Sequence, residues 1–130
     1  MVSRLEMVLR ELNENGSFRA SLFATSTGLV LASQKTESVN EKTIAAMSSL
    51  FAETANSASK EMDLSNLNVM KIKYEEDYIV FRNIILSKTN FILIILSNLP
   101  ESQEIENYTD QLLDWAIDNS KDDLERLSSI

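Results

Sequence analysis

The chain has 130 residues, of which 44% are hydrophobic and 25% are charged, the composition of one globular domain with its own core. It has no cysteine and no histidine, which excludes disulfides, thiolate or imidazole metal sites and histidine-based catalysis. Its net charge of −8 disfavours binding to nucleic acids and anionic membranes, and we expect a basic protein partner instead.

The first third of the chain predicts a helix followed by a β-hairpin. Residues 2–14 carry apolar side chains at helical spacing, and Gly16 suits a left-handed cap at the end of that helix. Apolar and polar residues then alternate over 18–24, which predicts a strand, and a turn ending at Gly28 leads to a return strand over 29–33. The N-terminal segment has no apolar run like that of a secretory signal, so we expect a cytoplasmic protein.

A long helix is predicted over residues 40–62, with Asn40 as its N-cap. One stripe of this helix is bulky and is predicted to pack on the sheet: Ile44, Met47, Phe51, Ala55, Ala58 and Met62. A second stripe has only small side chains: Ala45, Ser48, Ser49, Ala52, Asn56 and Ser59. This second stripe is either a solvated face or a close contact with another helix, and its lack of Glu, Lys and Arg favours the contact.

Three strands are predicted next, over residues 67–74, 78–87 and 91–97, joined by tight polar turns into an antiparallel meander. The last of them is apolar on both faces, so it is expected at the centre of the sheet with helices on both sides. The first is apolar on one face only and carries lysines on the other, which indicates an edge strand. A final helix is predicted to begin near residue 101, after Pro100.

The final helix has two apolar seams and one acidic row. Its predicted core stripe consists of Ile105, Tyr108, Leu112, Trp115 and Ala116, and a second seam of Leu113, Ile117, Leu124 and Leu127. Because the core stripe breaks at Asn119, we expect a domain over 1–119 and a helical extension or tail over 120–130, either disordered alone or docked on a partner. The acidic row is either a solvated face or a docking row for a basic patch: Glu106, Asp110, Asp114, Asp118 and Asp122.

The order of elements, the hairpin segment Ala-Thr-Ser-Thr-Gly-Leu-Val-Leu-Ala-Ser at residues 24–33 and the small-residue middle helix resemble the roadblock family over residues 1–117. The resemblance implies an α+β fold of order α-β-β-α-β-β-β-α. In this fold a five-stranded antiparallel sheet carries the long helix on one face and the N- and C-terminal helices on the other.

The resemblance also implies dimers, with a second copy or with a roadblock paralogue, in which the middle helices and the edge strands of two subunits meet. That places these residues at the expected interface: Ala45, Ser48, Ser49, Ala52, Asn56, Ser59, Val69 and Lys71. Members of the family bind and regulate small Ras-like GTPases, often on the paired middle helices. We therefore expect Glu53 and Lys60 of the middle helix to contact a partner, and the acidic row of the final helix adds Asp110, Asp114 and Asp118 as expected partner contacts.

The sequence lacks the parts that an enzyme of its own would need. Two glycines cannot form a dinucleotide fingerprint, and no phosphate-binding loop is present. Carboxylates at residues 75–77 are a conceivable metal site, but a charged hairpin tip is their ordinary explanation. We expect no cofactor, and a non-catalytic regulator of a GTPase. The alternatives are a structural assembly subunit with no effect on GTP hydrolysis, and a small-molecule sensor, which would need a roomy polar pocket.

Overall fold

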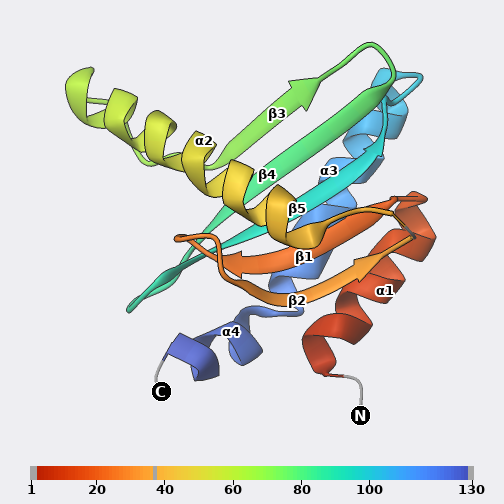
Figure 1. The fold of residues 1–130 in the computed structure, drawn as a ribbon, viewed down its shortest axis with the longest axis horizontal. Helices are drawn as coiled ribbons and strands as arrows, with labels where there is room; N and C mark the ends of the chain where they lie inside the picture. Colours follow the sequence, from red (N-terminus) through yellow and green to blue (C-terminus); the bar gives the residue numbers. More distant parts are fainter. Residues whose placement is uncertain (1–2, 37, 129–130) are drawn as a thin grey trace.

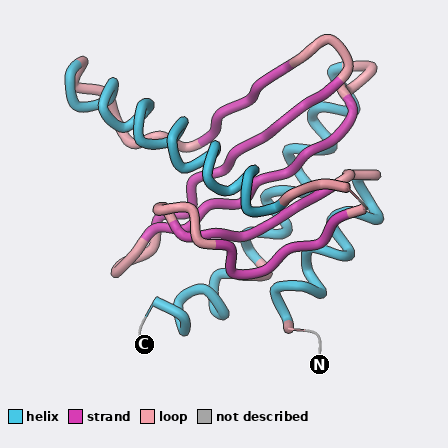
Figure 2. The backbone as a smooth tube through the Cα atoms, in the orientation of Figure 1, coloured by secondary structure: helices cyan, strands magenta, loops and turns pink. Residues whose placement is uncertain are grey.

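The computed structural model describes residues 3–36 and 38–128, which form five strands and four helices (Figures 1 and 2). In chain order these are α1 (Arg4–Gly16), β1 (Ala20–Thr25), β2 (Val30–Lys35), α2 (Glu41–Glu61), β3 (Val69–Lys73), β4 (Asp77–Ile85), β5 (Asn90–Asn98), α3 (Gln103–Asp118) and α4 (Lys121–Ser128). Each predicted element is present, and the predicted final helix is divided in two after Asp118.

The five strands form one antiparallel sheet of order β2-β1-β5-β4-β3. Strand β5 lies at the centre, and its residues 91–95 are all buried, as their apolar character on both faces predicts. Strand β3 is an edge strand, which confirms the interpretation of its lysines. Figure 1 shows α2 on one face of the sheet and α1 and α3 on the other, which is the predicted α+β arrangement.

The N-termini of three helices are capped by polar side chains that accept hydrogen bonds from free backbone N–H groups. Ser3 Oγ accepts from the Glu6 N–H of α1 at 3.1 Å, and Ser102 Oγ accepts from the Ile105 N–H of α3 at 3.2 Å. Asn40 Oδ1 accepts from two N–H groups at the start of α2, which confirms its predicted role. These caps place the starts of the helices within a residue or two of where the sequence predicts them.

The sheet separates two apolar cores of different size. The core on the α1/α3 side contains bulky side chains from the helices on that side and from the strands. They include Leu9, Phe23, Leu93 and Leu113, each with 0% of its surface exposed. The core on the α2 side is smaller, and only two buried alanines represent α2 in it. The α1/α3 side therefore supplies most of the burial that stabilises the fold.

Helix α2 packs on the sheet mainly with its small stripe, which lies beside the bulky stripe that was predicted to do so. Its buried residues are Ala45 at 0%, Ser48 at 4% and Ala52 at 7% exposure, and Ile44 of the bulky stripe is partly buried against the same core. Met47 and Leu50 are 46% and 56% exposed. The prediction that the bulky stripe packs on the sheet therefore holds for Ile44 but is wrong for Met47 and Met62, and the prediction that the three buried small residues face a partner is also wrong. Small side chains allow the helix to lie close to the strands, where Leu22, Phe81 and Ile94 fill the space.

The contact of the final helix with the sheet draws on both predicted seams. Leu113 and Ile117 of the second seam are buried, and so is Ala116 of the predicted core stripe, whereas Ile105 and Tyr108 of that stripe are each 47% exposed. After Asn119 the chain turns, and Leu124 of α4 is fully buried in the core on the α1/α3 side. The expectation that the segment after residue 119 leaves the domain body is therefore wrong for residues 120–128, and residues 129–130 lie outside the described part.

Candidate functional site

Helix α2 presents two further sides, besides the buried stripe, that have different chemistry. On one side lies what we call the apolar flank of α2, Met47, Leu50 and the half-buried Phe51. On the other side, Ser49, Glu53, Asn56 and Lys60 form a polar flank. The C-terminal end of the helix extends past the strands in Figure 1, so α2 is not covered by its own subunit along its whole length.

The polar flank lines an open groove of about 560 Å³ between α2 and the ends of the sheet. Most of its wall residues carry hydroxyl, amide or charged groups: Ser26, Thr27, Ser49, Glu53, Asn56, Ser57, Lys60, Asn83 and Asn90. Ala52 and Ile92 complete the lining. A second hollow of about 570 Å³ continues toward the C-terminal end of α2 and includes Ser59. These side chains donate and accept hydrogen bonds but include no histidine or cysteine, so the groove is suited to polar recognition of a partner.

The β1–β2 turn is fixed against the middle of α2. Ser49 Oγ donates a hydrogen bond of 2.9 Å to the Ser26 carbonyl oxygen. Gly28 has a φ of 96°, and a Cβ atom there would lie 3.3 Å from the Ser49 Cβ atom and 3.4 Å from the Ala45 carbonyl oxygen. Glycine thus permits both the left-handed turn and the close approach to α2. This contact gives the hairpin segment at residues 24–33 a structural role beside the groove.

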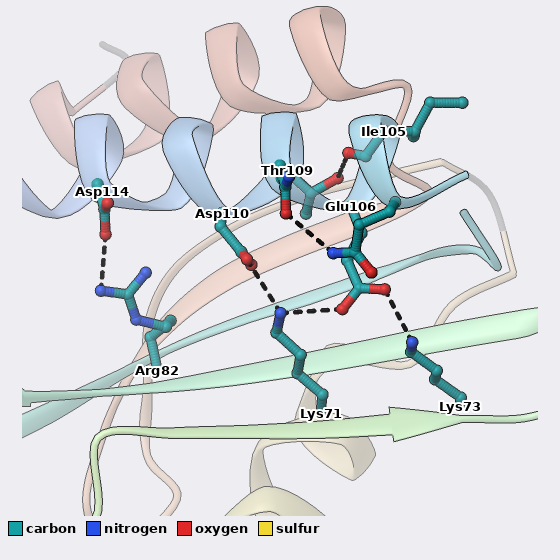
Figure 3. A network of polar contacts seen from close by, with 10 residues as sticks. Lys71, Lys73, Arg82, Ile105, Glu106, Thr109, Asp110 and Asp114 are labelled. Carbon is teal, nitrogen blue, oxygen red and sulfur yellow. Dashed lines mark hydrogen bonds and ion pairs between the residues drawn. The ribbon is translucent and has the colours of Figure 1, made fainter. Parts of the chain in front are cut away.

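On the opposite face, α3 is tied to the edge of the sheet by ion pairs (Figure 3). Lys71 Nζ donates to Glu106 Oε2 and Asp110 Oδ2, each at 3.0 Å, and Lys73 Nζ donates to Glu106 Oε1 at 2.8 Å. Arg82 of β4 pairs in the same way with Asp114, with 2.8 Å between Nη2 and Oδ1. The lysines of the edge strand therefore neutralise part of the acidic row of α3.

Three pKa shifts follow from these ion pairs and from burial around them. Hydrogen bonds from Lys73 and Lys71 hold the pKa of Glu106 below its usual value. Burial opposes the charge on Lys71, but the hydrogen bonds to Asp110 and Glu106 outweigh it, and the net pKa of Lys71 is raised. Burial raises the pKa of the neighbouring Tyr78 to about 12, against the effect of the Lys71 charge. With these shifts Glu106 and Lys71 are both charged at neutral pH.

The predicted site residues are divided among three places. Ser49, Glu53, Asn56 and Lys60 share the groove beside α2, with Ser59 in the adjoining hollow. Val69, Lys71, Asp110 and Asp114 surround a shallow pocket of about 220 Å³ at the β3 edge. Ala45, Ser48 and Ala52 are buried under α2.

The acidic row of α3 is used mainly inside the subunit. The expectation that it is open to a partner is wrong for Glu106 and Asp110, whose carboxylates are held by the lysines of β3. Asp114 is paired with Arg82, although 62% of its side chain is exposed. Asp118 is 71% exposed and lies 3.6 Å from Lys121, so a role for it toward a partner stays a prediction.

The residues that sequence reasoning missed are Met47, which the prediction placed in the stripe packed on the sheet, and Leu50, which belongs to neither predicted stripe. The available signal is the width of the apolar surface: with Ala45 and Ala52, the apolar residues of α2 extend over more of its circumference than one sheet contact covers. Among residues 3–36 and 38–128, no group of acidic side chains is arranged to hold a metal ion, and no helix is long and apolar enough to cross a membrane.

No family model matches the sequence, and no curated protein matches it. Solved structures do match. MglB of Myxococcus xanthus superposes with a TM-score of 0.80 at 11% identity, over 95% of this chain and 97% of that one. A roadblock/LC7 domain of Streptomyces avermitilis superposes with a TM-score of 0.79 at 13% identity, over 95% of this chain and 99% of that one. The gliding protein MglB of Thermus thermophilus superposes with a TM-score of 0.71 at 14% identity, over 92% of this chain and 90% of that one. The chain therefore has the roadblock fold, the fold of MglB and of roadblock/LC7 domains, as its sequence predicts.

Proposed function

We propose that the chain is a non-catalytic dimeric interaction module that binds and regulates a small Ras-like GTPase. The observation that carries this proposal is the apolar flank of α2, where Met47 and Leu50 are 46% and 56% exposed on a helix whose fully buried residues are all small. Exposed apolar side chains grouped on one element are typical of interaction surfaces. The flank is the surface that we assign to the contact between subunits.

A second copy of the chain is the partner that fits this flank. Two identical helices packed antiparallel about a two-fold axis bury the same residues on both sides, so an apolar flank is complementary to itself. The predicted interface is thereby moved from the buried stripe to Met47, Leu50 and Phe51. Val69, 40% exposed on the edge strand β3, keeps its predicted place, because an open edge can pair with the edge of a second sheet.

The groove beside α2 is the surface that we assign to the GTPase. It runs along the polar flank, so pairing through the apolar flank leaves it beside the contact between subunits. Glu53 and Lys60 supply charges of both signs, and Asn56 lies between them on the helix. The fold that this chain shares with MglB supports a role as an interaction module. One MglB structure described as having a tetrameric arrangement, which the chain matches with a TM-score of 0.71 at 14% identity, supports association of several copies.

Light scattering after size exclusion tests the dimer. We expect a particle of twice the 14.7 kDa chain mass, and we expect Leu50→Glu to convert it to a folded monomer, because the carboxylate would be buried without a partner. Met7→Glu is the matched control, since Met7 is 57% exposed on α1, and it should leave the dimer intact. A wild-type monomer at micromolar concentration would contradict the proposal.

A GTP hydrolysis assay with Ras-like GTPases of the same cell tests the regulatory role. We expect a change in single-turnover rate that depends on the concentration of this protein, and we expect Lys60→Glu with Glu53→Lys to weaken it, while the far-side Glu75→Lys does not. Binding with unchanged turnover would favour the structural assembly subunit. Absence of binding in both nucleotide states would contradict the assignment of the groove.

A further inference from the structure

Helix α3 carries an apolar surface that the fold covers only in part and that the proposed function does not use. Ile105 and Tyr108 are each 47% exposed, and Leu112 and Trp115 are half-buried at the margin of the core. The four side chains recur at intervals of three and four residues, so they form one continuous strip along three turns of the helix. We call this strip the α3 ridge. It lies on the α1/α3 side of the sheet, away from α2.

The ridge has an acidic border. Residues 101–120 contain six acidic residues and no lysine or arginine. Three of the six, Glu106, Asp110 and Asp114, point toward the sheet edge and are paired with basic side chains of β3 and β4 (Figure 3). The other exposed acids on α3 are Glu104, one helical turn before Tyr108, and Asp118, which is three residues after Trp115 and 71% exposed although Lys121 lies 3.6 Å from it. Both therefore lie beside the ridge on the solvent side of the helix.

We infer that the α3 ridge docks an amphipathic helix that carries lysine or arginine along its apolar face. A strip of ten residues of helix is about 15 Å long, which matches three or four apolar side chains at i, i+3/i+4 and i+7 of a partner helix. Long basic side chains can cover apolar surface with their methylene groups while their charged ends reach Glu104 and Asp118. The apolar ridge therefore specifies an apolar helix face on the partner, and the acidic border specifies basic side chains beside that face.

The same charge argues against other occupants. A second copy of this chain would place one acidic border against another, which costs free energy instead of supplying it. Nucleic acids and anionic membranes are repelled for the same reason. The inference goes beyond the proposed function, because the ridge and the apolar flank of α2 lie on opposite faces of the sheet.

Trp115 makes the inference directly measurable, since it is the single tryptophan of the chain and lies on the ridge. The probe is a synthetic 18-residue helix without aromatic residues, with leucines at i, i+3, i+4 and i+7 and lysines beside them. We expect it to shift the Trp115 emission to shorter wavelength in a saturable titration. Two control peptides keep the length: one has glutamate for lysine, and one has the same composition with the leucine spacing scrambled. Neither should bind.

Variants locate the contact. We expect Tyr108→Lys to weaken the peptide at least about tenfold, as loss of an aromatic anchor does, and Glu104→Lys to weaken it roughly threefold. Glu75→Lys at the β3–β4 turn is the matched charge reversal and should bind like the wild type. Tyr108 is half exposed, so its variant should melt within a few degrees of the wild type. Leu50→Glu should bind the peptide normally, which separates this test from that of the α2 dimer.

Three results would overturn the inference. Equal affinity of the lysine and glutamate peptides would remove the role of charge. Wild-type affinity of Tyr108→Lys would place the peptide elsewhere. A fall in particle mass on Tyr108→Lys, measured by light scattering, would assign the ridge to a second copy of the chain.

Discussion

The two faces of the sheet are covered in different ways. On the α1/α3 side, bulky side chains of three helices (α1, α3 and α4) and three strands (β1, β4 and β5) interlock in one large core that excludes solvent. On the α2 side, the helix contributes alanine and serine to the contact and keeps its larger apolar residues outside. The first face is completed within the subunit, whereas the second is covered without using the apolar surface that α2 offers. This difference supports assigning stability mainly to one face and assembly to the other.

Leucine truncation on each face tests this comparison with the largest expected effect. Leu93 of β5 and Leu22 of β1 are both buried, at 0% and 1% exposure, and belong to the cores on the α1/α3 side and the α2 side respectively. We expect Leu93→Ala to lower the free energy of unfolding by ~4 kcal/mol and Leu22→Ala by ~2–3 kcal/mol, because the larger core can collapse less around a cavity. Denaturant titrations of both variants, with parallel slopes, provide the measurement.

An equal or larger loss for Leu22→Ala would mean that the α2 side is as well packed as the other. The assignment of stability mainly to the α1/α3 face would then fail, whatever the oligomeric state. The two titrations should be run at the same protein concentration, because dissociation of a dimer adds to the apparent stability.

A charged residue in the buried stripe of α2 sharpens the comparison. Ala52 is 7% exposed and packs on the sheet, so we expect Ala52→Arg to lower the unfolding free energy by ~1–3 kcal/mol through overpacking. Leu50→Arg, two positions earlier on the exposed apolar flank, should leave the unfolding of the monomer nearly unchanged, so its apparent stability falls only by the lost association of two copies. Circular dichroism of the two variants during thermal melting distinguishes them. If Ala52→Arg melts at the wild-type temperature, the small stripe of α2 faces away from the sheet, as the sequence predicted.

The order and type of the elements could be predicted because each depends on a local signal. Alternation identified the strands, Asn40 identified the start of the long helix, and the two-sided apolar run of residues 91–95 identified the centre of the sheet. The lysines at positions 71 and 73 marked the edge strand. Such signals are set by the backbone periods of two and 3.6 residues, which do not depend on what lies farther along the chain.

The orientation of the two long helices could not be predicted in the same way. Periodicity gives the phase of each apolar stripe, but α2 and α3 each carry two stripes, and the choice between them depends on the shape of the sheet that receives the helix. On α2 the small stripe faces the strands, and on α3 the seam with Leu113 and Ile117 does. The rule that larger apolar residues face inward fails where a close approach is required and where an element is also a surface for partners. The groove residues Glu53 and Lys60 could be expected only from the family resemblance.

The β1–β2 turn provides a smaller test of how tightly α2 is held. Gly28 has a positive φ and lies against the backbone of α2, so alanine there would be strained and would need the helix to move by a few tenths of an ångström. We expect Gly28→Ala to lower the unfolding free energy by ~1–2 kcal/mol. In this variant the amides of α2 should exchange hydrogen faster than in the wild type. The amides of α3 should exchange faster only to the extent that the whole protein is less stable. Uniform exchange in both helices would mean that the turn does not position α2.

The smallest expected effect concerns the ion pairs on the α1/α3 side. The pKa of Glu106 is held below the ordinary value of 4.5, so the folded state binds fewer protons at this site than the unfolded state does near that pH. The stabilisation is therefore present above about pH 4.5 and is lost as the pH falls through the folded-state pKa. We expect Glu106→Gln to be less stable than the wild type by ~1 kcal/mol at pH 7, as a partly shielded ion pair contributes.

The difference in unfolding free energy between the wild type and Glu106→Gln should shrink as the pH is lowered from 5 to 3, because the wild-type Glu106 carboxylate becomes protonated. Glu41, whose pKa is lowered by the hydrogen bond from Lys35, titrates in the same range but is present in both proteins, so it cancels from the difference. Urea titrations at half-unit pH intervals provide the two curves. If the difference in unfolding free energy stays constant across this range, the variant acts through packing of α3 against the sheet. The lysines of β3 would then contribute no net stability on the α1/α3 side.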